Sequence, residues 1–190
     1  KAQYDLAVMY RDGIGVAKNF KMMVNHFKQA ANQGYDLAQR TLVHLYLEGI
    51  GVQKDQDSAI KWLKKSADNG SLDSQFELGN LYFYNKKYND SIIWLEKAAN
   101  RNHRKAQYFL GSLYLEVFEK KDYKKAVKWL TKAANNDYYE AQGKLGLLYV
   151  NGLGVEKDPE KAKELFQKSS QAGGGISTFN LAIMYGQGQV

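Results

Sequence analysis

Residues 141–173 read AQGKLGLLYVNGLGVEKDPEKAKELFQKSSQAG, and the same pattern returns along the whole chain of 190 residues. Each copy opens with a small residue followed by a polar one, at Ala2-Gln3, Ala38-Gln39, Ser74-Gln75, Ala106-Gln107, Ala141-Gln142 and Ser177-Thr178. Successive copies begin 32 to 36 residues apart. A period of this size is typical of solenoids and repeat arrays, in which each repeat packs on its neighbours.

The first half of each copy predicts an amphipathic helix, which we call helix A. The opening residue, the +4 leucine and the +8 tyrosine share one helical face, and a mostly small residue stands at +5. The leucines are Leu6, Leu42, Leu78, Leu110, Leu145 and Leu181, and the tyrosines are Tyr10, Tyr46, Tyr82, Tyr114, Tyr149 and Tyr185. The residues at +5 are Ala7, Val43, Gly79, Gly111, Gly146 and Ala182, and their small size would let a second helix approach closely.

The second half of each copy predicts a second helix, helix B, around the pairs His26-Phe27, Trp62-Leu63, Trp94-Leu95, Trp129-Leu130 and Leu165-Phe166. Small residues follow each pair on the same helical face. N-cap residues are expected seven positions before the pair, at Asn19, Asp55, Asp122 and Asp158. Left-handed residues are expected after helix B, at Gly34, Gly70, Asn102, Asp137 and Gly173.

The repeated residues of helix A and helix B resemble those of the Sel1-like repeat family, which is related to tetratricopeptide repeats. The resemblance implies an all-α fold, a right-handed α-α superhelix of helix-loop-helix repeats. We expect a single solenoid over residues 1–190, with repeats at about 2–37, 38–73, 74–105, 106–140 and 141–176 and a partial repeat at 177–190. The third repeat is four residues shorter and lacks the loop glycines, and the fourth carries Glu116-Val117-Phe118-Glu119 in their place.

The glycine pairs Gly13/Gly15, Gly49/Gly51 and Gly152/Gly154 are a possible phosphate-binding signal. A phosphate-binding GxGxxG follows a strand and opens a helix, whereas these pairs follow a helix and no strand pattern precedes them. They therefore favour a tight corner between helix A and helix B. We expect the residues between the glycines, Ile14, Ile50 and Leu153, to pack against their repeats.

No residues suggest chemistry. The chain has no cysteine, and the spacing of His26, His44 and His103 does not match a helical metal site. We therefore expect no catalytic residue, no metal and no cofactor. The resemblance implies one enzyme alternative, because a cysteine-rich branch of the family is linked to β-lactam binding or hydrolysis.

The net charge is +7, and it is spread over the repeats. The densest runs are residues 101–105 and the helix B stripe of Lys124, Lys128 and Lys132, which we interpret as solvated outer surface. Since a nucleic-acid binder more often gathers its charge in one stripe or groove, whereas the excess here is spread out, we expect no nucleic-acid binding. No stretch is apolar enough for a membrane span, and no leader is visible. The family resemblance suggests a bacterial protein, but the sequence leaves its compartment open between cytoplasm and periplasm.

The predicted partner-binding residues lie on helix A, because the resemblance to tetratricopeptide repeats implies that helix A lines the concave groove. The inward positions are then +2, +6, +9 and +10. They give Tyr4, Arg40, His44, Leu47, Glu48, Phe76, Asn80, Phe83, Tyr84, Tyr108, Leu115 and Val150. Leu47, Phe83, Leu115 and Val150 would form an apolar row, which marks a partner site if it is exposed. The alternative is that the row packs between adjacent A helices.

The sequence therefore predicts a non-catalytic module that binds an unidentified protein or peptide, as a bacterial scaffold or adaptor. The alternative is an immunity protein that neutralises a secreted toxin. The sixth repeat has only its helix A, which would leave Leu181, Met184 and Tyr185 uncovered. We expect this end to belong to a longer protein or to contact another molecule, for example by self-association.

Overall fold

A computed structural model describes residues 1–116, 121–186 and 188. Its A helices are α1 (Ala2–Asp12), α3 (Asp36–Glu48), α5 (Leu72–Tyr84), α7 (Arg104–Glu116), α9 (Tyr139–Asn151) and α11 (Gly175–Gly186). Its B helices are α2 (Phe20–Asn32), α4 (Gln56–Asp68), α6 (Tyr88–Ala99), α8 (Tyr123–Asn135) and α10 (Pro159–Gln171). The described residues contain no strand, so the prediction of an all-α chain is confirmed. Residues 117–120 of the fourth loop, which include Val117 to Glu119, lie outside the described residues.

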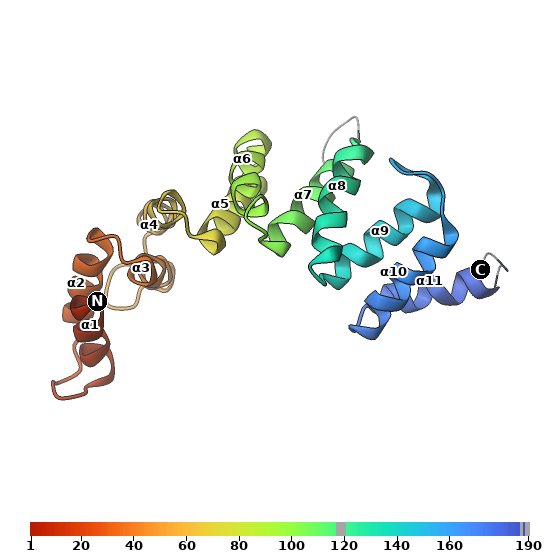
Figure 1. Cartoon of the computed structure of the whole chain (residues 1–190). Coiled ribbons are helices and arrows are strands. Elements are labelled where there is room, and N and C mark those ends of the chain that lie inside the picture. Colours follow the sequence, from red (N-terminus) through yellow and green to blue (C-terminus); the bar gives the residue numbers. More distant parts are fainter. Residues whose placement is uncertain (117–120, 187, 189–190) are drawn as a thin grey trace. The chain divides into compact units, whose positions relative to one another are not determined.

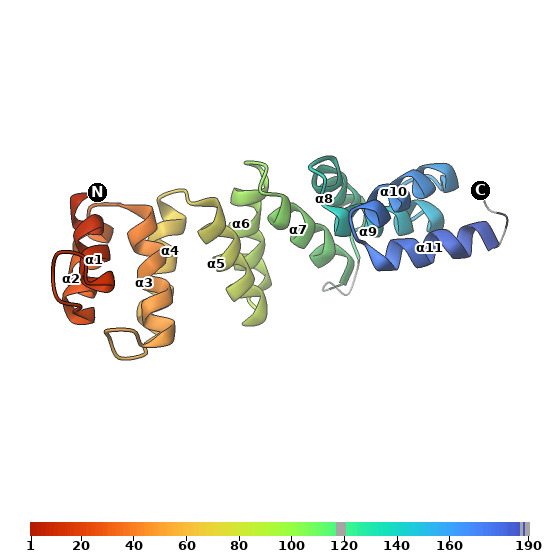
Figure 2. The same cartoon turned by 90° about the horizontal axis from the view of Figure 1, so that it is seen from below.

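The helices form two compact units, Lys1–Trp94 and Leu95–Val190 (Figure 1). The boundary between them falls within α6. In the first unit α2 packs on α1 and α3, and α4 packs on α3 and α5. In the second unit α8 packs on α7 and α9, and α10 packs on α9 and α11 (Figure 2). Each of these four B helices is thus placed between two A helices of its own unit, as expected of a repeat array.

Polar side chains begin the B helices as predicted. Asn19 accepts a hydrogen bond from the Met22 N–H at 3.0 Å, and Asp158 accepts one from the Lys161 N–H at 2.9 Å. Asp55 and Asp122 cap α4 and α8 in the same way. The expected left-handed residues after the B helices are also confirmed, at Gly34, Gly70, Asn102, Asp137 and Gly173.

The +8 tyrosine closes every A-to-B loop through its backbone. Its carbonyl accepts a hydrogen bond from the N–H of the residue that precedes helix B, at 2.9–3.1 Å. The bonds are Asn19 to Tyr10, Asp55 to Tyr46, Lys87 to Tyr82, Asp122 to Tyr114 and Asp158 to Tyr149. The loops with and without glycine therefore end at the same backbone contact.

The second glycine of the loop lies against the preceding helix B. A Cβ atom on Gly51 would lie 2.6 Å from the Phe20 carbonyl oxygen, and one on Gly154 would lie 2.6 Å from that of Tyr123. Both glycines also have positive φ angles, 72° and 75°, which other residues rarely adopt. Glycine is thus required here by close backbone approach and by conformation together.

The expectation that the residues between the loop glycines pack inward is wrong for two of the three loops. Ile14 is 60% exposed and Ile50 is 37% exposed, while Leu153 packs against the core of the second unit. The valine after the glycines is the side chain that turns inward. Val52 and Val155 both pack against core clusters.

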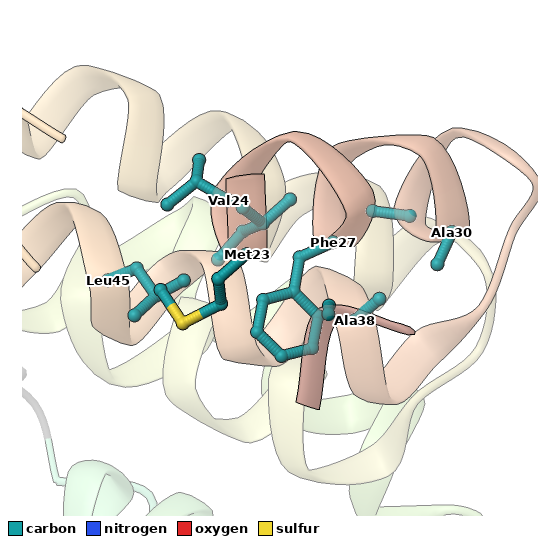
Figure 3. Packing of buried hydrophobic residues seen from close by; sticks show 9 residues of the cluster. Met23, Val24, Phe27, Ala30, Ala38 and Leu45 are labelled. Atoms are coloured by element: carbon teal, nitrogen blue, oxygen red, sulfur yellow. The ribbon is translucent and has the colours of Figure 1, made fainter. Parts of the chain in front are cut away.

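The core of the first repeat is built around Phe27, which is fully buried together with Met23 (Figure 3). Ala30 and Ala38 are also fully buried and allow α2 and α3 to approach closely. The Phe27 ring also meets the Tyr4 ring, with centroids 5.2 Å apart. Burial of a side chain of this size contributes about 1.5–3 kcal/mol.

In the second unit the small residues at +5 let the two helices of a repeat approach closely, as predicted. A Cβ atom on Gly111 would lie 2.6 Å from Cγ of Leu130, and one on Gly146 would lie 2.6 Å from Cε1 of Phe166. Both partners are fully buried. Helix B could not pack this closely if the +5 residue carried a side chain.

The prediction that the C-terminal helix leaves Met184 uncovered is wrong. Met184 is 2% exposed and packs with Ala162 and Phe166 of α10, and Leu181 packs against the same cluster. These side chains face α10, the helix B of the preceding repeat. Tyr185 is exposed as predicted, at 54%.

A buried glutamine fastens each of the second to fifth repeats to the repeat before it. The Nε2 groups of Gln39, Gln75, Gln107 and Gln142 donate to the carbonyl oxygens of Ala31, Ala67, Ala99 and Ala134 at 2.9–3.3 Å. These carbonyls belong to the last turn of the preceding helix B, where backbone acceptors lack helical partners. The glutamine of the opening dipeptide therefore has a structural role, because its side chain makes this bond.

Candidate partner-binding surface

Exposed apolar side chains gather on the A helices. Of thirteen large apolar side chains described as exposed, nine lie on A helices: Leu37, Leu47, Tyr84, Tyr139, Leu147, Ile176, Phe179, Ile183 and Tyr185. Two others, Phe20 and Ile93, lie on B helices, and Ile14 and Ile50 lie in loops. The exposed apolar surface is therefore concentrated on the helix set that sequence analysis predicted to bind a partner.

In the first unit, the predicted residues of α3 are accessible. His44 and Glu48 are exposed, and Leu47 is 39% exposed between them in sequence. Arg40 is half-buried and forms an ion pair with Asp73, with Nη1 and Oδ2 3.0 Å apart. This pair joins α3 to α5 on the side where α3 carries its exposed residues.

The end of α5 carries an aromatic group. Phe83 is half-buried, and its ring meets those of Tyr84 and Tyr88 at centroid distances of 5.5 Å and 5.8 Å. Tyr84 is the most exposed of the three, at 75%. Phe76 and Asn80 are half-buried on the same helix. Tyr84 is therefore the predicted aromatic residue that is most open to a partner.

Tyr4, by contrast, belongs to the structural core. It is half-buried between the rings of Phe27 and Tyr35, with centroids 5.2 Å and 5.1 Å away. The aromatic residue at +2 in the first repeat therefore supports packing, and little of its ring is left for a partner.

In the second unit, Tyr108 joins α7 to α9. The Nζ atom of Lys144 lies 5.6 Å from the centre of the Tyr108 ring, and the same ammonium group pairs with Glu116. The Tyr108 ring also meets that of Tyr138, with ring centres 5.1 Å apart. The cation, carboxylate and ring together form a polar-aromatic patch at the surface.

The last two members of the predicted apolar row are less open than Leu47. Leu115 and Val150 are half-buried, and each packs against a core cluster of the second unit. Of the inward positions in this unit, +6 and +2 carry exposed apolar side chains: Leu147 at 40%, Ile183 at 39% and Phe179 at 66%. That these residues stand at +6 and +2 could be read from the sequence. However, nothing in a single sequence shows that +6 is more open than +9.

The histidines and acidic residues of the described part of the chain do not gather into a metal site. That part contains no group of three His, Cys, Asp or Glu side chains that could hold a metal ion. His26 stacks on Tyr10 at 5.4 Å and its Nδ1 lies 2.8 Å from Oε1 of Gln3. His103 accepts a hydrogen bond from the Ala106 N–H and thereby caps α7. Two of the three histidines thus have structural roles.

None of the helices described here is both long and apolar enough to cross a membrane.

The Sel1 repeat model matches residues 1–35, 35–71, 72–103, 104–138 and 140–174. The chain belongs to the Sel1 repeat family. Sel1 repeats typically mediate protein interactions, which agrees with the exposed apolar A helices. Comparison with the sequences of curated proteins gave no match.

Solved structures with Sel1 repeats share the fold. A protective antigen of uropathogenic Escherichia coli, described as displaying an SLR fold, is 29% identical with a TM-score of 0.87, and the match covers 100% of this chain. The chain spans 42% of the length of that protein. A Sel1 repeat protein of Oxalobacter formigenes is 29% identical with a TM-score of 0.77, over 98% of this chain and 78% of its own. An immunity protein of Pseudomonas aeruginosa, 20% identical with a TM-score of 0.50 over 93% and 84%, shares the fold alone.

Proposed function

We propose that this Sel1 repeat chain binds a protein or peptide partner through the exposed side chains of its A helices, without chemistry of its own. The observation that carries the proposal is the concentration of exposed apolar side chains on A helices. Exposed apolar clusters rimmed by polar residues are typical of protein interaction sites. A scaffold or adaptor uses such a surface to hold another protein in place.

Each unit offers its own anchors. In the first, Leu47 of α3 and Tyr84 of α5 are exposed, and the Arg40–Asp73 ion pair joins the same two helices. In the second, Leu147 and Phe179 are exposed on the same set of helices as the Tyr108–Lys144 contact. Aromatic and large aliphatic side chains bind by being withdrawn from water, and nearby charged pairs fix the register of the partner.

The test is affinity capture with quantitative mass spectrometry, using the chain as bait. The test variant is Leu147→Glu, because Leu147 is 40% exposed on an A helix. The matched control is Ile93→Glu, which places the same carboxylate at a 52% exposed apolar position on a B helix. Phe83→Glu is a weaker choice, since the Phe83 ring contacts two other rings.

We expect a specific partner to be lost with Leu147→Glu and retained with Ile93→Glu, while circular dichroism shows that both variants remain folded. A partner that binds both variants equally would contradict the A-helix surface. If the captured partner is a toxin, its neutralisation in cells by the wild type would assign the immunity role rather than that of a scaffold.

A further inference from the structure

Helix α8 carries an unusual row of three lysines. Lys124, Lys128 and Lys132 are four residues apart, so they lie along one line of the helix over about 12 Å. All three are exposed. Two of them lie over the same ring, since the Nζ atoms of Lys128 and Lys132 are 5.4 Å and 4.7 Å from the centre of Trp129. Two of the three ammonium groups are therefore within cation–π distance of one indole ring.

The next helix B, α10, carries different side chains at the equivalent positions. Aligned on the aromatic or leucine pair, α10 carries Glu160, Glu164 and Lys168 where α8 carries its three lysines. None of the other B helices has lysine at all three positions, which read Lys-Asn-Gln in α2, Asp-Lys-Lys in α4 and Asn-Ile-Lys in α6. The row is thus a property of α8 and not of the repeat.

The cations of α10 are neutralised within their own helix. Glu164 pairs with Lys161 at 2.7 Å and with Lys168 at 2.8 Å, and Lys163 pairs with Glu160 at 2.7 Å. Helix α8 itself contains four lysines and no acidic residue. Among the residues that the structure describes, Lys124, Lys128 and Lys132 have no ion pair, and only Lys125 is paired, with Asp122 at 3.4 Å. Within the described part of the chain, Lys128 and Lys132 therefore have no acidic partner, and Lys124 shares the field of Asp122 with Lys125.

We infer that the α8 row of Lys124, Lys128 and Lys132 is a docking surface for an acidic helical segment of a protein partner. A helix with carboxylates four residues apart would place one carboxylate opposite each ammonium group. This surface lies on a helix B, so it is separate from the apolar A-helix surface proposed above and does not depend on it.

Other anionic partners fit α8 less well. None of its large apolar side chains is exposed, and Trp129 is 3% exposed. A single-stranded nucleic acid would find no exposed ring on which to stack its bases. A membrane would find no apolar side chain to insert between its lipids. Lysine also lacks the bidentate geometry with which arginine recognises phosphate. A row of carboxylates on a partner helix needs only the three lysine ammonium groups in order to bind.

The test uses fluorescence anisotropy in about 0.15 M salt, where charges more than about 8 Å apart are largely screened. The probe is a fluorescein-labelled, alanine-rich helical peptide with glutamate at every fourth position, and its glutamine counterpart is the control peptide. The test variant is Lys124→Glu/Lys128→Glu, which copies the residues that α10 carries at these positions. The control variant is Lys54→Glu/Lys157→Glu, with the same change in net charge at exposed loop lysines that precede the N-caps Asp55 and Asp158.

We expect the wild type to bind the glutamate peptide, the test variant to bind at least about tenfold more weakly, and the control variant to change by less than about twofold. Lys124→Gln/Lys128→Gln should show a smaller loss in the same direction. Equal weakening by the test and control variants, or no saturable binding of the wild type, would overturn the proposal. Tighter, α8-dependent binding of anionic vesicles or of single-stranded DNA would also overturn it, because the row would then serve lipid or nucleic acid.

Discussion

Replacing Gly146 by alanine should destabilise the protein, although alanine is the better helix former. A Cβ atom at this position would lie 2.6, 2.9 and 3.0 Å from Cε1, Cδ1 and Cζ of Phe166. Carbon atoms in contact prefer about 3.5–4.0 Å, so the ring must withdraw by about 0.9 Å. Phe166 is fully buried and packs against Met184, which leaves it little room to do so.

The size of the effect follows from two opposed contributions. Overpacking of a filled core costs about 1–3 kcal/mol, and the upper end applies because three ring atoms are affected. Alanine in place of a helical glycine recovers about 1 kcal/mol. The net loss in the free energy of unfolding of Gly146→Ala is therefore about 2 kcal/mol. For a chain of this length, that lowers Tm by about 4–8 °C.

The assay is thermal and urea denaturation followed by circular dichroism. The control is Gly175→Ala, since Gly175 is also helical and a Cβ atom there would meet nothing within 4 Å. This variant should be neutral or slightly more stable. A Gly146→Ala protein as stable as the wild type would refute the reasoning about close approach. The double variant Gly146→Ala/Phe166→Leu should lose less than the sum of its single changes, because a smaller side chain relieves the clash.

Three further changes test other contacts. Gln107→Leu removes the buried donor to the Ala99 carbonyl and should lower the free energy of unfolding by about 1–3 kcal/mol in urea, whereas Gln167→Leu on the exposed surface should not. Asp158→Ala removes the N-cap of α10 and should cost about 1 kcal/mol in the same assay. Hydrogen bonds from two lysines lower the pKa of Glu164 from 4.5 to about 2. Its stabilisation is therefore present above pH 4.5 and lost as the pH falls towards 2, so the Tm difference between Glu164→Gln and wild type should vanish over that range.

The period, the two helices of each repeat and their caps could be read from the sequence because they depend on local chemistry. An aspartate seven residues before Trp62 caps α4 whatever the rest of the chain does. The +5 glycine is similar, since Gly146 is a small residue on the helical face that already carries leucine and tyrosine. These features need only helical geometry to be interpreted.

The exposure of single side chains could not be read in the same way, because it depends on packing between helices. Ile50 and Leu153 occupy equivalent loop positions, yet only Leu153 packs against a core cluster. Val150 is half-buried while Leu147, one turn earlier on α9, is 40% exposed. Met184 is covered by α10, a helix that belongs to the repeat before it. Such differences are decided by neighbours that a periodic pattern does not specify.

The backbone bond from the +8 tyrosine has a consequence for how such chains can change. The bond spans nine residues from Tyr10 to Asn19 and five from Tyr82 to Lys87, with lengths of 2.9 Å in both. Because it uses only a carbonyl and an N–H group, the residues it encloses can vary in number and kind while the hairpin is still closed. The A-to-B loop can therefore be lengthened, shortened or exchanged between repeats. The two helices remain joined by the same backbone hydrogen bond whatever sequence the loop has.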